Sequence, residues 1–229
     1  MMIPNRSEVI PERTLRRIPH YHQILSDLES KGEQYVSSKY LAGFLQIDDT
    51  QVRKDVSVIG YRGKPKSGYS VSELRNAIGE YLGFNFENTA ILIGAGRLGS
   101  ALAEYQGFAE YGLKIVAVFD NNPQRVGKLI SGFTILPLES LPRVVNSYNI
   151  GIAILTVPKA AAQDVCERVV SMDIQAIWNF APARLDVPEG VIVRNENLAV
   201  GVALLSHYLK THKTQKTQKT QKTRKPKKD

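Results

Sequence analysis

The feature that most constrains this chain is a strand, a tight glycine turn and a helix start in quick succession. Four apolar residues at 90–93 are followed at once by Gly94, Gly96 and Gly99, and then by residues that favour helices. In this spacing the first glycine allows the turn, the second lets a phosphate approach the backbone, and the third lets the helix pack on the strand. The helix N-terminus offers free N–H groups to an anion. The stretch therefore predicts a phosphate-binding loop.

Asp120 extends this prediction from a phosphate to a dinucleotide. It follows the apolar run 115–119, twenty-one residues after Gly99, where a dinucleotide-binding fold places the carboxylate that binds a ribose 2′-hydroxyl. The same carboxylate would repel a 2′-phosphate, so the sequence favours NAD(H) over NADP(H) as the cofactor. The alternative is a glycine-rich turn between strand and helix with an incidental aspartate.

Strands and helices alternate between residues 90 and 179. Apolar runs at 115–119, 150–155 and 176–179 are separated by helical stretches, which is typical of an α/β fold with a doubly wound parallel sheet of the Rossmann type. Such a sheet binds its ligand beyond the carboxyl ends of its strands. The residues expected there form the candidate cofactor site: Gly94, Ala95, Gly96, Arg97, Leu98, Gly99, Asp120, Thr156, Val157, Pro158, Asn179, Phe180 and Ala181.

Three short helices are expected ahead of this region. The first follows Pro19, after an N-terminal arm at 1–13, and ends at Gly32. The second begins near Ser37 or Ser38 as its N-cap and buries Leu41, Phe44 and Leu45. The third starts at Asp48 and ends at residue 60, and the two later helices are joined by a tight turn. This arrangement predicts a helix-turn-helix.

The third helix has the composition of a DNA-recognition helix. A rotation of about 100° per residue places Thr50, Arg53, Lys54 and Ser57 on its solvent face, and Gln51 stands where it could complete a capping box. The second helix of a helix-turn-helix enters the major groove. Arginine can pair with guanine edges there, while lysine, threonine and serine can hold phosphates.

A basic hairpin signal follows directly at residues 61–69. The segment YRGKPKSGY carries Arg62, Lys64 and Lys66 without an acidic residue, and its glycines and proline favour a turn. This predicts a basic wing beside the recognition helix, and a helix at 71–84 closes the module. The alternative is that the charged helix face is merely solvated and that the loop is an ordinary turn.

The positive charge of the chain is concentrated at one end. Of its 30 basic and 22 acidic residues, nine and one lie at 210–229, which leaves 21 of each in the other 209 residues. The net charge of +8 is therefore no evidence that the folded part binds nucleic acid. The segment 211–229, with its KTQ repeats, cannot form a core and is expected to be a disordered basic tail.

The helix expected at 197–210 is apolar on nearly all sides, with Asn197 as its N-cap. Its composition demands burial on two sides, which a homodimer would provide. Paired helix-turn-helix modules on a two-fold axis would read a palindromic site in double-stranded DNA. The alternative is a helix docked inside its own monomer.

Composition narrows the remaining classes. No apolar run approaches the roughly 18 residues of a membrane helix, and the N-terminus lacks a signal-peptide core, so we expect a cytoplasmic protein without membrane contact. The single cysteine, Cys166, is expected to pack in a helix. The four histidines have no thiols or carboxylates near them at metal-ligand spacing, so no metal is expected.

Several segments together carry a resemblance to a known family. They are IPERTLRRIPHYHQIL near the start, VSS at 36–38, QVRKD at 51–55, GYSVSEL from residue 68, IGAGRLGSALAEY, LTVP at 155–158 and NFAP at 179–182. Over roughly 11–209 the chain resembles the Rex family of redox-sensing transcriptional repressors. The resemblance implies a winged-helix domain at 1–84, an NAD(H)-binding Rossmann-like domain at 85–196 and a helix at 197–210 exchanged between the subunits of a homodimer. It also implies that NADH favours release from operator DNA, while NAD⁺ favours or permits the bound form.

Carried over by position, the resemblance assigns residues to DNA and to the cofactor. It places the nucleotide in the glycine loop and strand ends given above. The DNA-contacting residues, together with those expected from the helix and the wing, are Ser38, Thr50, Gln51, Arg53, Lys54, Ser57, Arg62, Lys64, Lys66 and Tyr69.

This chain departs from the family pattern at positions linked to redox sensing. In some members an arginine of the first helix, a tyrosine after the glycine motif and an aspartate before the last helix are joined by an ion pair. Tyr105 is kept here as the switch candidate, but the other two positions are Gln23 and Asn197, which cannot form that pair. Val58 and Ile59 also replace the usual Tyr-Phe. A paralogue with altered or lost NADH/NAD⁺ discrimination is therefore an alternative.

Two other functions fit parts of the pattern. An NAD-dependent oxidoreductase with an N-terminal helical adaptor would need a proton donor or base in the crevice, and only Lys159 is a weak candidate. A DNA-binding regulator could instead hold coenzyme A or another nucleotide in the same kind of pocket, which Asp120 disfavours. The sequence thus favours a regulator that is not an enzyme.

Overall fold

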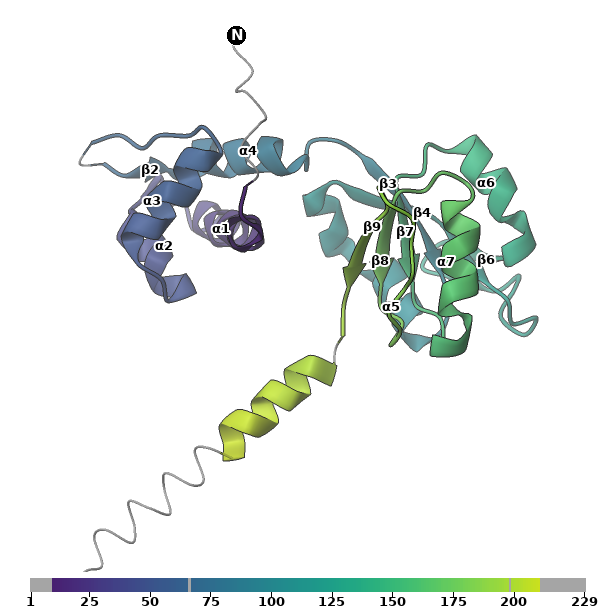
Figure 1. Ribbon diagram of the computed structural model, residues 1–229. Helices are drawn as coiled ribbons and strands as arrows, with labels where there is room; N and C mark the ends of the chain where they lie inside the picture. The colour runs from purple at the N-terminus through teal and green to yellow at the C-terminus, as the bar shows by residue number, and fades with distance from the viewer. Residues whose placement is uncertain (1–9, 66, 198, 211–229) are drawn as a thin grey trace, which may run out of the picture. The chain divides into compact units, whose positions relative to one another are not determined.

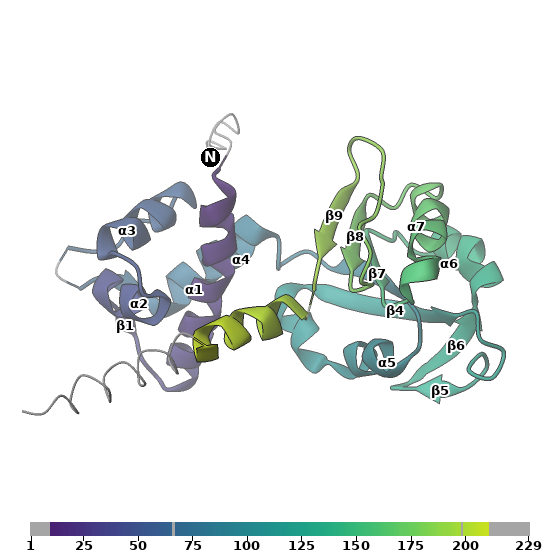
Figure 2. The same ribbon diagram turned by 60° about the horizontal axis from the view of Figure 1, so that its bottom comes forward.

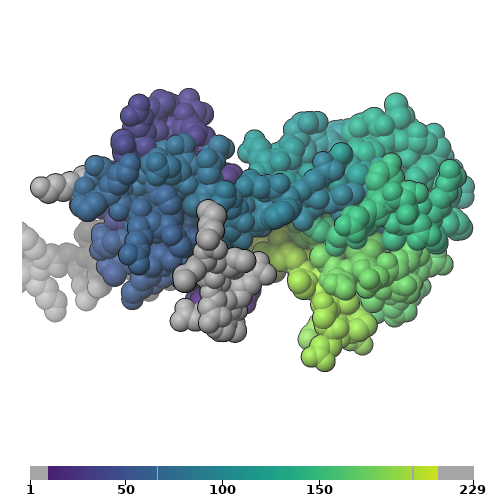
Figure 3. Space-filling view, turned by 90° about the horizontal axis from the view of Figure 1, so that it is seen from above, coloured from purple at the N-terminus to yellow at the C-terminus, as the bar shows by residue number. Residues whose placement is uncertain are grey.

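The computed structural model describes residues 10–65, 67–197 and 199–210 (Figure 1). The chain forms two compact units, one made of Met1–Glu87 with Gly107–Leu113 and the other of Asn88–Gln106 with Lys114–Asp229. In the space-filling view the purple-to-blue residues belong to the first unit and most of the teal-to-yellow residues to the second (Figure 3). Each unit has its own buried apolar cluster.

The first unit contains four helices and a two-stranded antiparallel sheet. Its elements are α1 (Glu12–Ser30), β1 (Tyr35–Val36), α2 (Ser38–Leu45), α3 (Asp49–Val58), β2 (Tyr69–Ser70) and α4 (Val71–Leu82). α1 packs on α4, and α2 packs on α3. Leu25, Leu41, Val52 and Leu74, one from each helix, are fully buried in the shared core. The segment between α3 and β2 is the predicted wing.

The start of α1 differs from the prediction. The helix begins at Glu12, so Pro19 lies inside it instead of preceding it, and the predicted arm is shorter than 1–13. A proline inside a helix removes one backbone hydrogen bond and costs about 3 kcal/mol. Ile18 and Tyr21 on either side are almost completely buried, and this tertiary packing offsets the cost. Residues 1–9 of the predicted arm lie outside the described residues.

The predicted caps of α2 and α3 are confirmed. Ser37 Oγ accepts a hydrogen bond from the Tyr40 backbone N–H at 3.1 Å, and Asp48 Oδ1 accepts one from the Thr50 N–H at 2.7 Å. Each side chain satisfies an N–H group that the first turn of a helix leaves without a partner. The turn between the two helices passes through Gln46, which has a φ of 51°.

Two side chains of these helices lie elsewhere than predicted. Phe44 is 60 % exposed, and the buried residues of α2 are Leu41 and Ala42. Gln51 does not complete a capping box, because its amide donates to Asp55 Oδ1 at 2.8 Å.

Asp55 connects α3, the predicted recognition helix, to α1. Its carboxylate is almost fully buried and accepts bonds from two guanidinium nitrogens of Arg17 at 2.7 and 2.8 Å, from the Tyr21 hydroxyl at 2.8 Å and from Thr14 Oγ1 at 3.2 Å. Burial would raise the pKa of Asp55, but the bonds from Arg17, Gln51 and Tyr21 outweigh burial and lower the pKa. Loss of one partner of such a buried ion pair typically costs about 3–5 kcal/mol.

The second unit is a seven-stranded sheet with helices on both faces, which confirms the predicted fold class. The strand order is β5-β6-β4-β3-β7-β8-β9, and the registered pairs β4–β6, β3–β7, β7–β8 and β8–β9 are parallel. The strands are β3 (Asn88–Ile93), β4 (Leu113–Asp120), β5 (Leu129–Ile130), β6 (Phe133–Pro137), β7 (Ile152–Leu155), β8 (Ala176–Asn179) and β9 (Ile192–Asn195). α5 (Arg97–Glu104) lies on one face, and α6 (Leu141–Ser147) and α7 (Ala162–Val170) lie on the other (Figure 2).

Three strands and one break in a helix were not predicted from the sequence. β5 and β6 form an antiparallel pair, and β9 extends the sheet beyond β8. α5 ends at Glu104, and the chain continues as a 3₁₀ helix, Gln106–Tyr111. Most of that segment packs within the first unit, where the ring of Tyr111 lies 5.0 Å from Phe84 and 6.0 Å from His22, measured between ring centroids.

The last helix spans residues 199–210, and every one of these residues is exposed. Asn197 Oδ1 accepts a bond from the Ala199 N–H at 3.0 Å, as expected of an N-cap. Val202, Leu205 and Leu209 are each 63–64 % exposed. Within the described chain this apolar helix therefore buries none of its side chains. The basic tail at 211–229 lies outside the described residues.

Candidate functional site

A cavity of about 480 Å³ opens at the carboxyl ends of β3, β4 and β7. It brings together eight of the predicted cofactor residues: Gly94, Gly96, Leu98, Asp120, Thr156, Val157, Pro158 and Phe180. The other five predicted residues, Ala95, Arg97, Gly99, Asn179 and Ala181, do not line it. Further residues that the sequence analysis did not single out do line it, including Asn122, Arg125 and Leu138.

The three glycines of the loop meet three different steric demands. Gly94 has a φ of 107°, and a β-carbon there would lie 2.8 Å from the Thr156 backbone. A β-carbon on Gly99 would overlap the carbonyl oxygen of Gly94. A β-carbon on Gly96 would meet no atom within 4 Å. The open space at Gly96 is therefore where a phosphate can approach the backbone at the start of α5.

Thr156, the first residue after β7, bonds the glycine loop. Its hydroxyl lies 2.6 Å from the carbonyl oxygen of Gly94 and donates to it. The same oxygen Oγ1 is the atom closest to a side chain placed on Gly99, apart from the Gly94 carbonyl. Thr156 thus fixes the distance between β7 and the start of α5.

Asp120 binds the loop as well as lining the cavity. It is 4 % exposed, and its two carboxylate oxygens accept bonds from the Ala95 N–H and the Asn122 N–H, both at 2.8 Å. Arg125 adds an ion pair to Oδ2 at 3.1 Å. Because this guanidinium partly neutralises the carboxylate and lines the same cavity, the charge argument against a 2′-phosphate is weaker than the sequence suggests. Arg125, which weakens the charge argument, lies only five residues after Asp120 in the chain.

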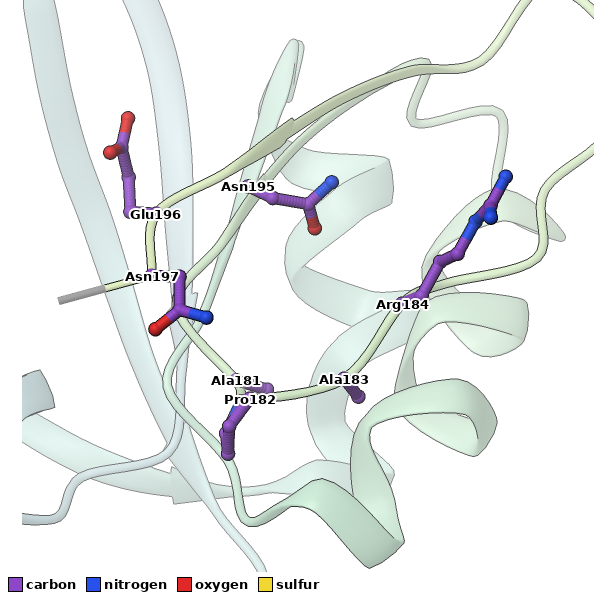
Figure 4. A pocket seen from close by; sticks show the side chains of 7 residues that line it. All are labelled: Ala181, Pro182, Ala183, Arg184, Asn195, Glu196 and Asn197. Atoms are coloured by element: carbon purple, nitrogen blue, oxygen red, sulfur yellow. The ribbon is translucent and has the colours of Figure 1, made fainter. Parts of the chain in front are cut away.

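A second cavity of about 270 Å³ adjoins the end of β9. Residues 181–184, in the loop after β8, face Asn195 and Asn197 across it (Figure 4). Pro182 lines both cavities. Asn197 caps the last helix from this position, so the start of that helix is part of the cavity wall.

Asn179 does not line the cavity of about 480 Å³ but holds the backbone next to it. It is 1 % exposed, donates to the Ala183 carbonyl at 2.9 Å and to Asn195 Oδ1 at 2.8 Å, and accepts from the Ala181 N–H at 3.0 Å. These bonds shape the loop between the two cavities. The predicted switch residue Tyr105 follows α5 as its C-cap and is 59 % exposed.

In the first unit, the predicted recognition face is exposed. Thr50, Arg53, Lys54 and Ser57 all lie on the solvent side of α3, which confirms the predicted rotation of the helix. In the wing, the basic side chains of Arg62 and Lys64 are also exposed, and the backbones of Lys64 and Gly68 pair in a β-bridge. Lys66 lies outside the described residues.

Three of the residues predicted to contact DNA are buried or half-buried, unlike the exposed ones above. Tyr69 is 7 % exposed, because it pairs with Val36 in the small sheet and its ring packs over Gly63, so its contact with DNA stays a prediction. Gln51 is half-buried and bonded to Asp55. Ser38, also half-buried, accepts a bond from Arg53 Nη1 at 3.3 Å.

The described part of the chain shows no group of three or more side chains that could hold a metal ion. Cys166 is buried in α7, and burial raises the pKa of its thiol, which fits the packing position expected for it. Among the described helices, none is long and apolar enough to cross a membrane.

Two family models match the chain. Residues 85–183 match a family described as "CoA binding domain", and residues 9–57 match one described as "Putative DNA-binding protein N-terminus". Curated relatives match over most of the chain. The redox-sensing transcriptional repressor Rex of Clostridioides difficile is 41 % identical over 93 % of this chain and all of its own length. That of Treponema denticola is 42 % identical over 87 % of this chain and 95 % of its own.

Solved structures of a Rex-family repressor called RSP match both units. The complex of RSP with β-NAD⁺ and operator DNA superimposes with a TM-score of 0.84 at 33 % identity, covering 93 % of this chain and 99 % of RSP. The complex with β-NADH gives a TM-score of 0.83 at 32 % identity, covering 92 % and 99 %.

The glycine geometry predicts opposite outcomes for two substitutions. Gly96→Val should leave the melting temperature unchanged, because its β-carbon enters open space, but should lower the affinity for dinucleotide by about 10-fold or more by filling the phosphate approach. Gly99→Ala should lower the stability of the second unit by about 1–3 kcal/mol through overpacking. Fluorescence of the single tryptophan, Trp178 in β8, reports unfolding of this unit. Full dinucleotide affinity in Gly96→Val would contradict the placement of the phosphate.

Proposed function

The chain belongs to the Rex family of redox-sensing transcriptional repressors, and from this premise we propose that it represses transcription by binding palindromic operator DNA as a homodimer. NADH in the pocket of the second unit releases it from the DNA. It is a regulator rather than an enzyme, and it acts on DNA in the cytoplasm.

One observation supports both halves of this proposal. RSP, which was solved with β-NAD⁺ and operator DNA in one complex, matches 93 % of the chain, including both units. This chain also has residues suited to binding a dinucleotide and residues suited to binding DNA. The cavity of about 480 Å³ contains the open approach at Gly96, and α3 presents Arg53 and Lys54 to solvent. We assign Arg53 to guanine edges, and Lys54, Ser57, Arg62 and Lys64 to positioning on phosphates.

The last helix supports the homodimer. Three large apolar side chains on it are more than 60 % exposed, and a helix of this composition requires a partner surface. A second copy of the chain is the partner that also supplies a second recognition helix for a palindrome. Asn197, which caps this helix, lies in the wall of the second cavity, beside the loop at 181–184, and we assign to this contact a link between the helix and the nucleotide pocket.

Coupling between pocket and DNA requires a difference in NADH affinity between two shapes of the dimer. Coupling free energies of this kind are typically about 1–3 kcal/mol, and a ligand that binds both shapes equally would switch nothing. α5 begins at the glycine loop and the chain continues through Tyr105 into Gly107–Leu113, which packs in the DNA-binding unit beside His22 and Phe84. This continuous segment is the path that we assign to the coupling.

The operator itself tests the proposal. A duplex selected by the protein from a random library should be palindromic, and fluorescence anisotropy should show that NADH weakens binding to it by about 5- to 150-fold, as the typical coupling implies. NAD⁺ should weaken it less. Coenzyme A serves as a further ligand, because one family model carries that description. Release by coenzyme A and not by NADH would contradict the assignment of the cofactor, and equal effects of NADH and NAD⁺ would indicate the paralogue without redox discrimination.

Arg53→Ala should lower operator affinity by about 10-fold or more, because a bidentate arginine–guanine pair contributes about 1–3 kcal/mol. NADH affinity should stay unchanged, since Arg53 lies in the other unit. Arg168→Ala, which removes an exposed arginine from α7, is the matched control and should leave operator affinity unchanged. Specific binding by Arg53→Ala at wild-type affinity would show that α3 is not the recognition helix.

Leu205→Glu should convert the dimer to a monomer, because it places a charge in the apolar surface of the last helix. Sedimentation velocity would detect the change in mass. Ser206→Glu, an exposed polar position of the same helix, should remain dimeric. A Leu205→Glu protein that stays dimeric would show that the subunits associate elsewhere.

A further inference from the structure

A carboxylate stands within the surface that we assign to DNA. Asp49, in the first turn of α3, forms an ion pair with Arg53 in which Oδ2 and Nη1 are 2.7 Å apart. The two side chains are 37 % and 52 % exposed. Arg53 Nη1 also donates to Ser38 Oγ at 3.3 Å, and Nη2 donates to Thr50 Oγ1 at 3.3 Å. Side chains from α2 and α3 therefore hold the guanidinium from three directions.

Asp49 is not the cap of α3, and its place in the first turn and the long 3.5 Å bond that it accepts from Ser38 Oγ contribute little to stability. Asp48 already caps α3 through the Thr50 N–H. An exposed ion pair between residues four apart in a helix contributes only about 0.3–0.5 kcal/mol. On a DNA-binding face, a negative charge opposes the electrostatic attraction to phosphates that supplies most of the nonspecific affinity. The Asp49 carboxylate therefore lowers the nonspecific affinity for DNA. The contact that could compensate for this loss is its ion pair with Arg53.

The bonds to Arg53 leave a defined set of donors. A guanidinium has five N–H donors, and Nη1 directs its two to Asp49 and Ser38. Nη2 uses one for Thr50, and no described residue accepts from Nε. Nε–H and the second N–H of Nη2 remain, two neighbouring donors of the kind that pair with O6 and N7 of guanine.

We propose that Asp49 is a specificity-determining residue that positions Arg53 for a guanine edge. Together with Ser38 it fixes the guanidinium before DNA arrives, so less side-chain entropy is lost when the base contact forms. Asp49 itself touches no base. The inference rests on the proposed function, because it requires that α3 reads DNA.

The proposal predicts changes of unequal size for two kinds of DNA. Asp49→Asn removes one negative charge from each subunit, so affinity for a scrambled duplex should rise. Affinity for the operator should not rise with it, because the guanidinium is no longer held. The ratio of operator affinity to scrambled-duplex affinity should therefore fall by about 10-fold, within the range that one bidentate contact supplies.

Asp48→Asn is the matched control. It removes the same charge one residue away, and asparagine caps a helix about as well as aspartate. Asp48 bonds the Thr50 N–H rather than Arg53. Affinities for both duplexes should therefore rise by the same factor, and their ratio should stay constant.

Anisotropy titrations of the full chain with both duplexes, at several salt concentrations, measure this ratio of affinities and so test the role of Asp49. In an Arg53→Ala background, Asp49→Asn should no longer change the ratio, and melting temperatures should match the wild type because both aspartates are on the surface. A ratio that is equal in Asp49→Asn and Asp48→Asn would overturn the role of Asp49 alone. A wild-type protein that does not distinguish the duplexes would overturn the proposed function, and this inference with it.

Discussion

The nucleotide pocket depends on the close contact between the start of α5 and the ends of β3 and β7. Gly99 lies so near the Gly94 carbonyl that no side chain fits between them, and Thr156 bonds that same carbonyl at 2.6 Å. Asp120 fixes the next residue of the loop through the Ala95 N–H. Together these contacts leave one open approach, at Gly96, to the N-terminus of a helix. The side chains of Thr156 and Asp120 thus hold the loop in the shape that leaves the Gly96 backbone open, as our proposal of a nucleotide pocket requires.

In the DNA-binding unit, a buried charge, the Asp55 carboxylate, fixes the orientation of a functional element, the helix α3. Asp55 accepts bonds from Arg17, Tyr21 and Thr14 of α1, so the back of the recognition helix is fixed while its front carries Arg53. A rotation of α3 that broke this buried ion pair would leave a buried charge without its partner. The ion pair therefore holds α3 in one orientation. A rigid recognition helix is what a switch requires, because a change in the spacing of two such helices then changes the fit to a palindrome.

Sequence patterns predicted the parts of this structure that depend on local spacing. The glycine loop, Asp120, the caps at Ser37 and Asp48, and the exposed face of α3 all follow from periodicity or from the demands of one turn. The patterns failed where tertiary contacts decide the outcome. Pro19 lies within a helix because neighbouring side chains are buried.

Two other features were not predicted. Arg125 lies five residues after Asp120, and its place in the pocket depends on a tertiary contact that no periodicity marks. The strands β5, β6 and β9 were also not predicted: β5 has only two residues and three of the four residues of β9 are exposed, whereas β6 carries an apolar run that was not assigned to a strand. The most direct test of the account is reciprocity: NADH binding, followed by its own fluorescence, is measured with and without saturating operator. The account predicts that operator weakens NADH binding by the same factor by which NADH weakens operator binding, and an NADH affinity unaffected by operator would contradict it.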